Sequence, residues 1–313
     1  MFFTLTLNPA IDQTVLVKPP LALGAICSVT GETRTPGGKG VNVAKMIAAN
    51  GKSVTAGGLL GKKDLPFFDG ALTPAGIACR FLAVPFETRI NTMLTDGIGH
   101  EIKLNKPGFP DLEFPEGHLI AYAETLAKKG LAIIMSGSLP VRFPADTYAR
   151  LIRIFRKAGC VTVLDTSGPA LAAGLAEQPD VIKPNRHELE QVLARQLDSE
   201  AAIKDSLREL TKRHEVVILS DGAAGAWFAS RGTLLFAPSP DVPRVDTTGA
   251  GDTLLGQFCA DYFPARTLTP EIAARAVAAG AAAVEQQGTP VISLKRVREL
   301  GRTVAVISRD ASS

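Results

Sequence analysis

Amphipathic segments alternate with short apolar runs along most of the chain beyond residue 115. Helical spacing marks residues 116–129, 145–157 and 201–213. Apolar runs mark residues 131–135, 161–164, 181–182 and 216–219, which fall between or after the helical segments. Short apolar strands separated by helices are typical of parallel sheets buried on both faces. The pattern predicts an α/β fold, a doubly wound, mostly parallel sheet with helices on both faces.

Two segments show a two-residue alternation instead, at residues 12–17 and 87–104. Such two-faced alternation indicates a small antiparallel β flap outside the main sheet. The chain contains no internal repeat, low-complexity segment or linker. We therefore expect one domain over residues 1–313, with the flap attached to it. In parallel sheets of this kind, ligands bind at the carboxyl ends of the strands.

The charges nearly cancel, with 34 Lys and Arg against 31 Asp and Glu and a net charge of +3. No basic footprint therefore favours nucleic-acid or membrane-surface binding. No apolar run approaches the ~18–20 residues of a membrane-spanning helix, and residues 1–7 are typical of a first strand and not of a signal peptide. The four cysteines are widely spaced and form no C-x-x-C, which predicts reduced thiols in a cytoplasmic protein.

The strongest local motif is Asp246-Thr247-Thr248-Gly249-Ala250-Gly251-Asp252, followed by a helical run over residues 254–262. Small residues at a helix start leave its first N–H groups open, and together with the helix dipole these form an anion site. A carboxylate at Asp252 suits that place if it accepts a proton from a hydroxyl while the amides stabilise a phosphoryl group. The alternative is a tight glycine turn with an ordinary first-turn acid.

A second glycine-rich segment, Gly37-Gly38-Lys39-Gly40, precedes a helix that is expected to end at Asn50, with Gly51 as its C′ residue. Glycine allows a ligand close to the backbone, and a lysine suits a phosphate. Asn42 offers the donor and acceptor that a sugar hydroxyl needs. The alternative is a glycine turn with a solvated lysine.

A third motif, Asn185-x-x-Glu188, follows a predicted strand and begins a helix. Asn at the N-cap and Glu at N3 form a capping box, which explains both residues without function. A carboxylate at the end of a strand is equally suited to hold the water shell of Mg²⁺ beside a nucleotide phosphate.

Together these motifs, with Asn8-Pro9-Ala10-Ile11-Asp12, resemble the pfkB-type sugar kinases of the ribokinase superfamily over essentially the whole chain. The resemblance is greatest to the hexose-phosphate branch, which includes 1-phosphofructokinase, tagatose-6-phosphate kinase and the minor 6-phosphofructokinase. The segments that carry the branch resemblance are 4–10, 36–42, 88–91, 136–140, 164–168 and 183–185.

The resemblance implies a role for each motif. Asp252 is expected to be the base, with Gly249, Ala250 and Gly251 as the anion hole. The residues expected at the sugar are Asp12, Gly38, Lys39, Asn42 and Ser138, with Arg89 on the phosphate that the substrate already carries. Those expected at ATP are Lys183, Asn185, Ser220, Gly222, Gly225 and Gly280, with Glu188 holding Mg²⁺ through water. The flap corresponds to the family's lid, from about residues 8–18 and 86–106, through which we expect a homodimer.

One departure from the branch stands at Asp246, where Asp-Thr-Thr replaces the usual Ser-x-Val. Ribokinases carry an acid there that helps to hold potassium, so a monovalent cation, K⁺, is expected at Asp246. The alternative is that Asp246 caps the turn through Thr248 or pairs with Arg244.

The implied activity is ATP- and Mg²⁺-dependent phosphorylation of a ketohexose phosphate, with fructose 1-phosphate converted to the 1,6-bisphosphate. The alternatives are a 6-phosphofructokinase, a tagatose-6-phosphate kinase, a kinase of an unphosphorylated sugar or nucleoside, and a non-catalytic sugar-phosphate sensor. Retention of Asp252 with its three small neighbours argues against the sensor.

Overall fold

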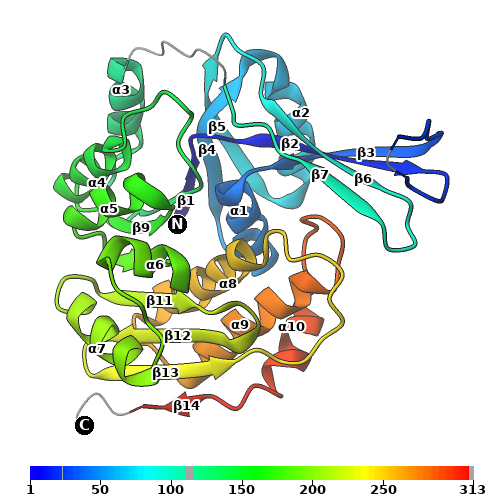
Figure 1. The fold of residues 1–313 in the computed structure, drawn as a ribbon. Helices are drawn as coiled ribbons and strands as arrows, with labels where there is room; N and C mark the ends of the chain where they lie inside the picture. Colours follow the sequence, from blue (N-terminus) through cyan, green and yellow to red (C-terminus); the bar gives the residue numbers. More distant parts are fainter. Residues whose placement is uncertain (23, 110–115, 310–313) are drawn as a thin grey trace.

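The computed structural model describes residues 1–22, 24–109 and 116–309, and most of its strands form one large sheet (Figure 1). The ten strands of this sheet lie in the order β14-β13-β12-β11-β10-β9-β8-β1-β4-β5. The pairings from β11 to β5 are parallel, whereas β12, β13 and β14 add antiparallel pairings at the other edge. The strands are β1 (Phe2–Thr6), β4 (Val54–Gly61), β5 (Ile77–Val84), β8 (Ala132–Ser136), β9 (Val161–Asp165), β10 (Val181–Ile182), β11 (Val216–Ser220), β12 (Gly225–Ser230), β13 (Thr233–Pro238) and β14 (Ile307–Ser308).

Helices cover both faces of this sheet, as expected. Successive strand residues point to opposite faces, and Ile133 and Ile134 of β8 accordingly belong to different hydrophobic clusters. Ile134 packs in the cluster that contains residues of α1, α8 and α9, and Ile133 in the one with residues of α3, α4 and α5. The helices are α1 (Lys39–Ala49), α2 (Leu65–Leu72), α3 (Glu116–Leu126), α4 (Thr147–Lys157), α5 (Gly168–Ala176), α6 (Arg186–Leu193), α7 (Glu200–Leu210), α8 (Ala250–Ala265), α9 (Pro270–Val284) and α10 (Leu294–Gly301).

A separate four-stranded sheet, here called the lid, projects from the main sheet (Figure 1). Its order is β3-β2-β6-β7, with β2 at Ala10–Val17, β3 at Val29–Gly37, β6 at Arg89–Thr95 and β7 at Glu101–Leu104. The outer pairings are antiparallel as predicted, but the central pair of β2 and β6 is parallel. The reason is that β2 follows β1 and β6 follows β5, which are parallel strands of the main sheet, so both enter the lid in the same direction.

The strands of the main sheet bring polar residues to its carboxyl edge. Ser136 ends β8, Asp165 ends β9, Lys183 follows β10 and Ser220 ends β11. The helix and strand predictions beyond residue 115 are confirmed in kind, with boundaries that shift by a few residues. Across residues 1–22, 24–109 and 116–309, every helix is too short or too polar to cross a membrane.

Candidate active site

Two adjoining cavities lie at the carboxyl edge of the main sheet. The smaller one, of about 350 Å³, is lined by Asp12, Gly38, Lys39, Asn42, Arg89, Asn91, Lys183, Asn185, Glu188, Ser220, Thr248, Gly249, Gly251 and Asp252. The larger one, of about 790 Å³, shares Asn185, Ser220 and Gly251 with it and adds Gly222, Gly225, Ala250 and Gly280. The structure therefore brings together residues that are far apart in sequence, in two chambers that meet at the start of α8. Of the predicted residues, Ser138 and Asp246 line neither chamber.

The start of α8 forms the junction between the chambers. Gly249 is the N-cap residue and has φ 76°, a left-handed conformation that favours glycine. A Cβ there would lie 2.8 Å from the Thr289 methyl group, so space as well as conformation requires glycine. The first N–H groups of a helix lack partners within it. The sixteen-residue helix α8 therefore presents its positive end to both chambers.

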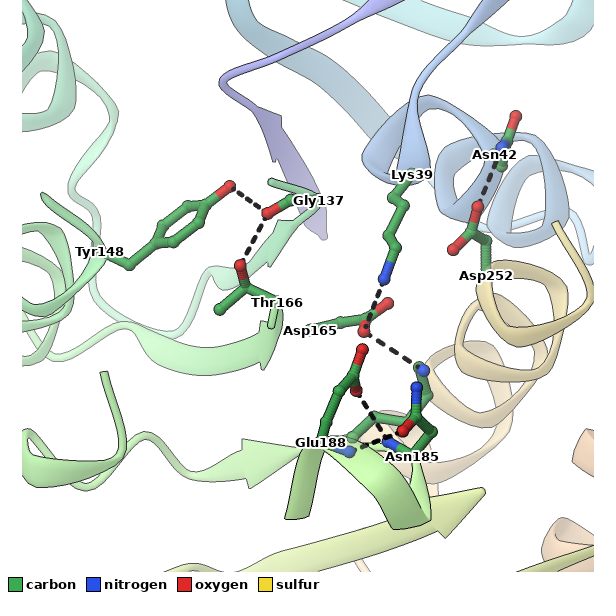
Figure 2. Close-up of polar contacts among 10 residues, drawn as sticks. Lys39, Asn42, Gly137, Tyr148, Asp165, Thr166, Asn185, Glu188 and Asp252 are labelled. Atoms are coloured by element: carbon green, nitrogen blue, oxygen red, sulfur yellow. Dashed lines mark hydrogen bonds and ion pairs between the residues drawn. The ribbon is translucent and has the colours of Figure 1, made fainter. Parts of the chain in front are cut away.

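Asp252 stands in the first turn of α8 and is only 6% exposed. The Asn42 side chain donates a hydrogen bond to Asp252 Oδ2 at 2.9 Å (Figure 2). Burial, followed by repulsion from Asp165, raises the pKa of Asp252 to about 6. Lys39 and Lys183 oppose that rise but do not cancel it. A carboxylate with such a pKa can accept a proton near neutral pH.

Asp165 is the centre of a buried charge cluster that the sequence analysis did not place in the site. Its carboxylate is fully buried, and its Oδ1 lies 3.2 Å from Lys183 Nζ and 3.4 Å from Lys39 Nζ (Figure 2). This proximity raises the pKa of Lys39, chiefly through the Asp165 charge, so the lysine stays protonated. The sequence signal was present, because an acid directly after the apolar run 161–164 lies at the carboxyl edge where ligands bind.

Two amide side chains line the smaller cavity, and their Oδ1 atoms are buried without a hydrogen-bond partner. Asn91 donates to Asp12 Oδ1 at 3.1 Å, and the Oδ1 atoms of Asn42 and Asn91 are buried and accept no hydrogen bond. Buried acceptors without donors are costly. Because these oxygens expose almost no surface, a sugar hydroxyl would reach them only if the side chains turned toward the cavity. Sequence reasoning found Asp12 and Asn42 but missed Asn91, which lies opposite Asp12 only because β2 pairs with β6.

The approach to this chamber depends on close contacts at glycine. A Cβ at Gly37 would lie 2.1 Å from a carboxylate oxygen of Asp12, and Gly38 has φ 110° with the Thr6 methyl group 2.9 Å from where its Cβ would be. The helix α1 then begins at Lys39 and ends at Ala49, followed by the Asn50 C-cap and Gly51 with φ 68°, as the sequence predicts.

Arg89 lines the smaller cavity, but its guanidinium also binds backbone. Its Nε, Nη1 and Nη2 donate to the carbonyl oxygens of Pro9 at 3.2 Å, Lys106 at 2.8 Å and Asn8 at 3.1 Å. A guanidinium has five N–H groups, so two remain for a ligand. The acids that could have paired with it have other partners, since Glu87 pairs with Lys63 and Glu101 with Lys103.

Ser138 and the Asn185-x-x-Glu188 motif have local partners. Asn8 donates to Ser138 Oγ at 3.1 Å, so Ser138 lies beside the first loop and away from the cavity lining. Asn185 and Glu188 form the predicted capping box at the start of α6, and both also line the smaller cavity. The box uses Oε2 of the half-buried Glu188 carboxylate and leaves its Oε1 as a hard-oxygen donor on this wall. Such a donor fits a hydrated Mg²⁺ beside a nucleotide phosphate.

Asp246 does not fit the potassium ion expected there. Its Oδ1 accepts hydrogen bonds from Lys103 Nζ at 2.8 Å and from the N–H and hydroxyl of Thr248 at 2.9 and 2.7 Å, and its Oδ2 accepts from the Gly288 N–H at 3.0 Å. A cation at Oδ1 of this 4% exposed carboxylate would have to displace an ammonium group. The turn-capping alternative through Thr248 is the one that the structure shows.

Comparison with known proteins places this geometry in a family. Residues 8–295 match the pfkB family carbohydrate kinases. The chain belongs to this family. It is a carbohydrate kinase, as the sequence motifs predicted. Its fold is similar to that of ribokinase from Thermotoga maritima, at a TM-score of 0.73 and 21% identity, covering 96% of this chain and 99% of the other, which confirms the expected fold class.

Individual relatives of this kinase cover nearly its whole length. It is 33% identical over 312 residues to a 1-phosphofructokinase of Xanthomonas campestris pv. campestris, with 97% of each chain covered. It is 35% identical over 312 residues to a 1-phosphofructokinase of Rhodobacter capsulatus, with 97% of this chain and 96% of the relative covered. Among solved structures, phosphofructokinase-2 from Escherichia coli in complex with potassium is similar at a TM-score of 0.88 and 26% identity, covering 96% of this chain and 98% of the other.

Proposed function

We propose that this kinase transfers the γ-phosphate of ATP to a hydroxyl of a ketohexose phosphate, with fructose 1-phosphate as substrate and fructose 1,6-bisphosphate as product. The observation that carries the proposal is the buried Asp252 carboxylate at the positive start of α8, where the two cavities meet. The relatives described as 1-phosphofructokinases support this choice of hexose phosphate.

In the proposed reaction, Asp252 takes the proton of the attacking sugar hydroxyl. Its raised pKa favours a proton transfer near neutral pH, and Asn42 fixes the carboxylate through Oδ2. The backbone N–H groups of Gly249, Ala250 and Gly251 form the anion hole that stabilises the charge on the transferred phosphoryl group. This assignment uses positioning and charge neutralisation, which are the main requirements of phosphoryl transfer.

The smaller cavity would bind the sugar phosphate. Asp12, Asn42 and Asn91 line it and would bind the hydroxyl groups, with Gly38 giving close access to the backbone. Lys39 carries a positive charge that Asp165 keeps protonated and in place. Arg89 supplies its two remaining N–H groups to the substrate's phosphate, and Ser138 supports this end of the pocket through Asn8.

The larger cavity would bind ATP. Its volume and its small residues, Gly222, Gly225 and Gly280, suit an adenine ring lying against α9 and the start of β12. Asn185, Ser220 and Lys183 lie toward the junction, near the phosphates. Bound Mg²⁺, held through water by Glu188, would neutralise charge on the β- and γ-phosphates.

Two further expectations belong to this proposal. Residues 1–313 would act as one kinase domain, with β2, β3, β6 and β7 as its lid. A homodimer formed through the lid stays a prediction, supported by the exposed Leu16, Val29 and Leu104 on lid strands. Multi-angle light scattering of the wild type and of a Val29→Asp, Leu104→Asp variant would measure it.

The test of function is an ADP-release assay over a matched set of acceptors. The set is fructose 1-phosphate, fructose 6-phosphate, tagatose 6-phosphate, fructose, ribose and adenosine, each with and without Mg²⁺. The Asp252→Asn variant gives the background rate for each acceptor. We expect kcat/KM for fructose 1-phosphate to exceed every other value by at least about 10-fold. A higher value for another acceptor would reassign the substrate. No turnover with any acceptor, together with binding of a sugar phosphate by calorimetry, would favour the sensor.

A further inference from the structure

One ion pair joins the lid to the body of the kinase at the edge of the anion-hole turn. Lys103 on β7 places its Nζ 2.8 Å from Oδ1 of Asp246, which stands three residues before Gly249. Lys103 also lies 3.2 Å from Glu101 on the same strand. The Asp246 carboxylate is buried and the lysine side chain is 36% exposed, so the ammonium closes off a carboxylate that water cannot reach.

The register of the lid directs Lys103 toward the site. Lys103 lies opposite Met93 on β6, and Met93 lies opposite Thr14 on β2. Two residues earlier on β2 and β6 stand Asp12 and Asn91, which line the smaller cavity. Because side chains alternate along a strand, residues two apart share a face. Lys103 therefore projects from the same face of the lid as the residues proposed to hold the sugar.

Asp246 connects three separate segments. It binds Lys103 of the lid, the N–H and hydroxyl of Thr248 in the turn that leads into α8, and the N–H of Gly288 in the loop after α9. Burial raises the pKa of Asp246, but these hydrogen bonds outweigh it and keep the carboxyl below its ordinary value. The carboxylate is thus ionised, and Lys103 is the cation that faces it.

We propose that Lys103 is the built-in cation of this active site: its ammonium group, carried by the lid, neutralises Asp246 beside the anion-hole turn, so the kinase needs no bound monovalent cation there. The proposal rests on the assignment of residues 249–251 as the anion hole. Lys103 acts as a positioning residue, since it touches the turn and not the substrate.

Two physical reasons support this assignment. A bound potassium ion supplies one positive charge to hard oxygen ligands and thereby orders the loops that carry them. The Lys103 ammonium supplies the same charge to Asp246 Oδ1 and occupies the space within hydrogen-bonding distance of that oxygen. A potassium ion placed beside it would be repelled by the ammonium. Since Lys103 belongs to the lid, the charge reaches Asp246 when the lid lies over the site.

The experiment compares the wild type with Lys103→Met, which keeps the length of the side chain without its charge. Initial rates are measured with the best acceptor in tetramethylammonium, sodium and potassium chloride at constant ionic strength. Melting temperatures without substrate, in the same salts, report cation binding without turnover. If the kinase prefers another sugar phosphate, the same rates are measured with that acceptor. Failure of the proposed substrate is therefore distinguished from failure of this inference.

We expect less than a threefold difference in wild-type rate among the salts, and no potassium-specific change in its melting temperature. Lys103→Met is expected to lose at least about 10-fold in kcat in tetramethylammonium. Potassium is expected to raise the kcat of this variant at least about threefold. It is also expected to raise the melting temperature of the variant by about 2 °C or more, because a ligand that binds only the native state stabilises it.

The matched control is Lys63→Met, which removes a lysine from the exposed pair with Glu87 outside both cavities. Its rates should follow the wild type in every salt. Lys103→Gln, which retains a donor without the charge, repeats the test if Lys103→Met does not fold. Three results would each overturn the proposal. The first is a wild-type rate that rises threefold or more with potassium, and the second is a Lys103→Met variant that is as active as the wild type in tetramethylammonium chloride. The third is a loss of kcat in Lys103→Met that potassium does not restore.

Discussion

Replacing Asp252 by Asn tests the role of this side chain in catalysis separately from its effect on stability. The substitution keeps the size of the side chain and an oxygen that can accept the hydrogen bond from Asn42, now 2.9 Å from Asp252 Oδ2. It removes the carboxylate that is proposed to accept the proton. General-base catalysis contributes at least about 10²-fold, so we expect kcat to fall by at least that factor. The KM for ATP should change little, because the walls of the larger cavity, where the nucleotide is proposed to bind, are unaltered.

The same substitution should stabilise the folded protein. Burial raises the pKa of Asp252 from 3.8 to about 6. The folded protein therefore binds this proton more tightly than the unfolded chain does. Stability contributed by the group is greatest when it is protonated, at low pH, and is lost as pH rises from about 3.8 through about 6. Two pKa units correspond to about 3 kcal/mol as an upper bound, so Asp252→Asn should raise the free energy of unfolding at pH 8 by about 1–3 kcal/mol.

The pH profile of the wild type gives an independent measure of the same carboxyl. The base must be ionised to act, so kcat/KM should rise with pH through about 6 and level off above pH 7. The ionised fraction changes from roughly one eleventh at pH 5 to roughly ten elevenths at pH 7, which predicts about a tenfold increase.

The assay combines initial rates of ADP release between pH 5 and 8.5 with urea unfolding at pH 8. The control is Asp261→Asn, the same chemical change on the same helix α8, at a half-buried acid that binds Gln257 and Arg275 away from both cavities. Its kcat should stay within about twofold of wild type. Near-wild-type kcat in Asp252→Asn, or a loss of activity accompanied by an equal loss of stability, would refute the assignment of Asp252 as a buried base.

Three further substitutions test other parts of the structure. Arg89→Ala should raise KM for a sugar phosphate at least about 10-fold more than for the free sugar, and equal effects would leave Arg89 as a brace for backbone carbonyls. Asp165→Asn leaves two lysines without their shared anion and should lower the free energy of unfolding in urea by about 3 kcal/mol. The acid limb of kcat/KM should move to lower pH, because the Asp165 charge that helps to raise the pKa of Asp252 is gone. Gly256→Ala places a methyl group 2.8 Å from a backbone carbonyl of α1 and should destabilise the protein by about 1–3 kcal/mol. Gly70→Ala, at an exposed position of α2 with nothing within 4 Å, should be neutral or stabilising in the same titration.

Local features of this protein could be predicted from the sequence because they depend on residues within a few positions of one another. The capping box of Asn185 and Glu188 spans four residues, and the glycine entry to α8 is a single turn. The alternation of apolar runs and amphipathic segments likewise reports burial on both faces of a sheet, whatever the order of its strands. These patterns predicted the fold class, the glycine entries to α1 and α8 and the cap of α6, whereas the resemblance to pfkB-type kinases supplied the other predicted residues of the two cavities.

What only the tertiary structure decided depends on contacts between distant segments. Asp165 meets Lys39 across 126 residues, and Lys103 meets Asp246 across 143. Neither contact leaves a periodic signal, because each depends on which strands are neighbours and on the register between them. The parallel pairing of β2 with β6 has the same origin, as does Asn91 lying opposite Asp12. An acid at Asp246 is compatible with a bound potassium ion as far as the sequence shows, and it is the lid folding over it that supplies an ammonium group instead.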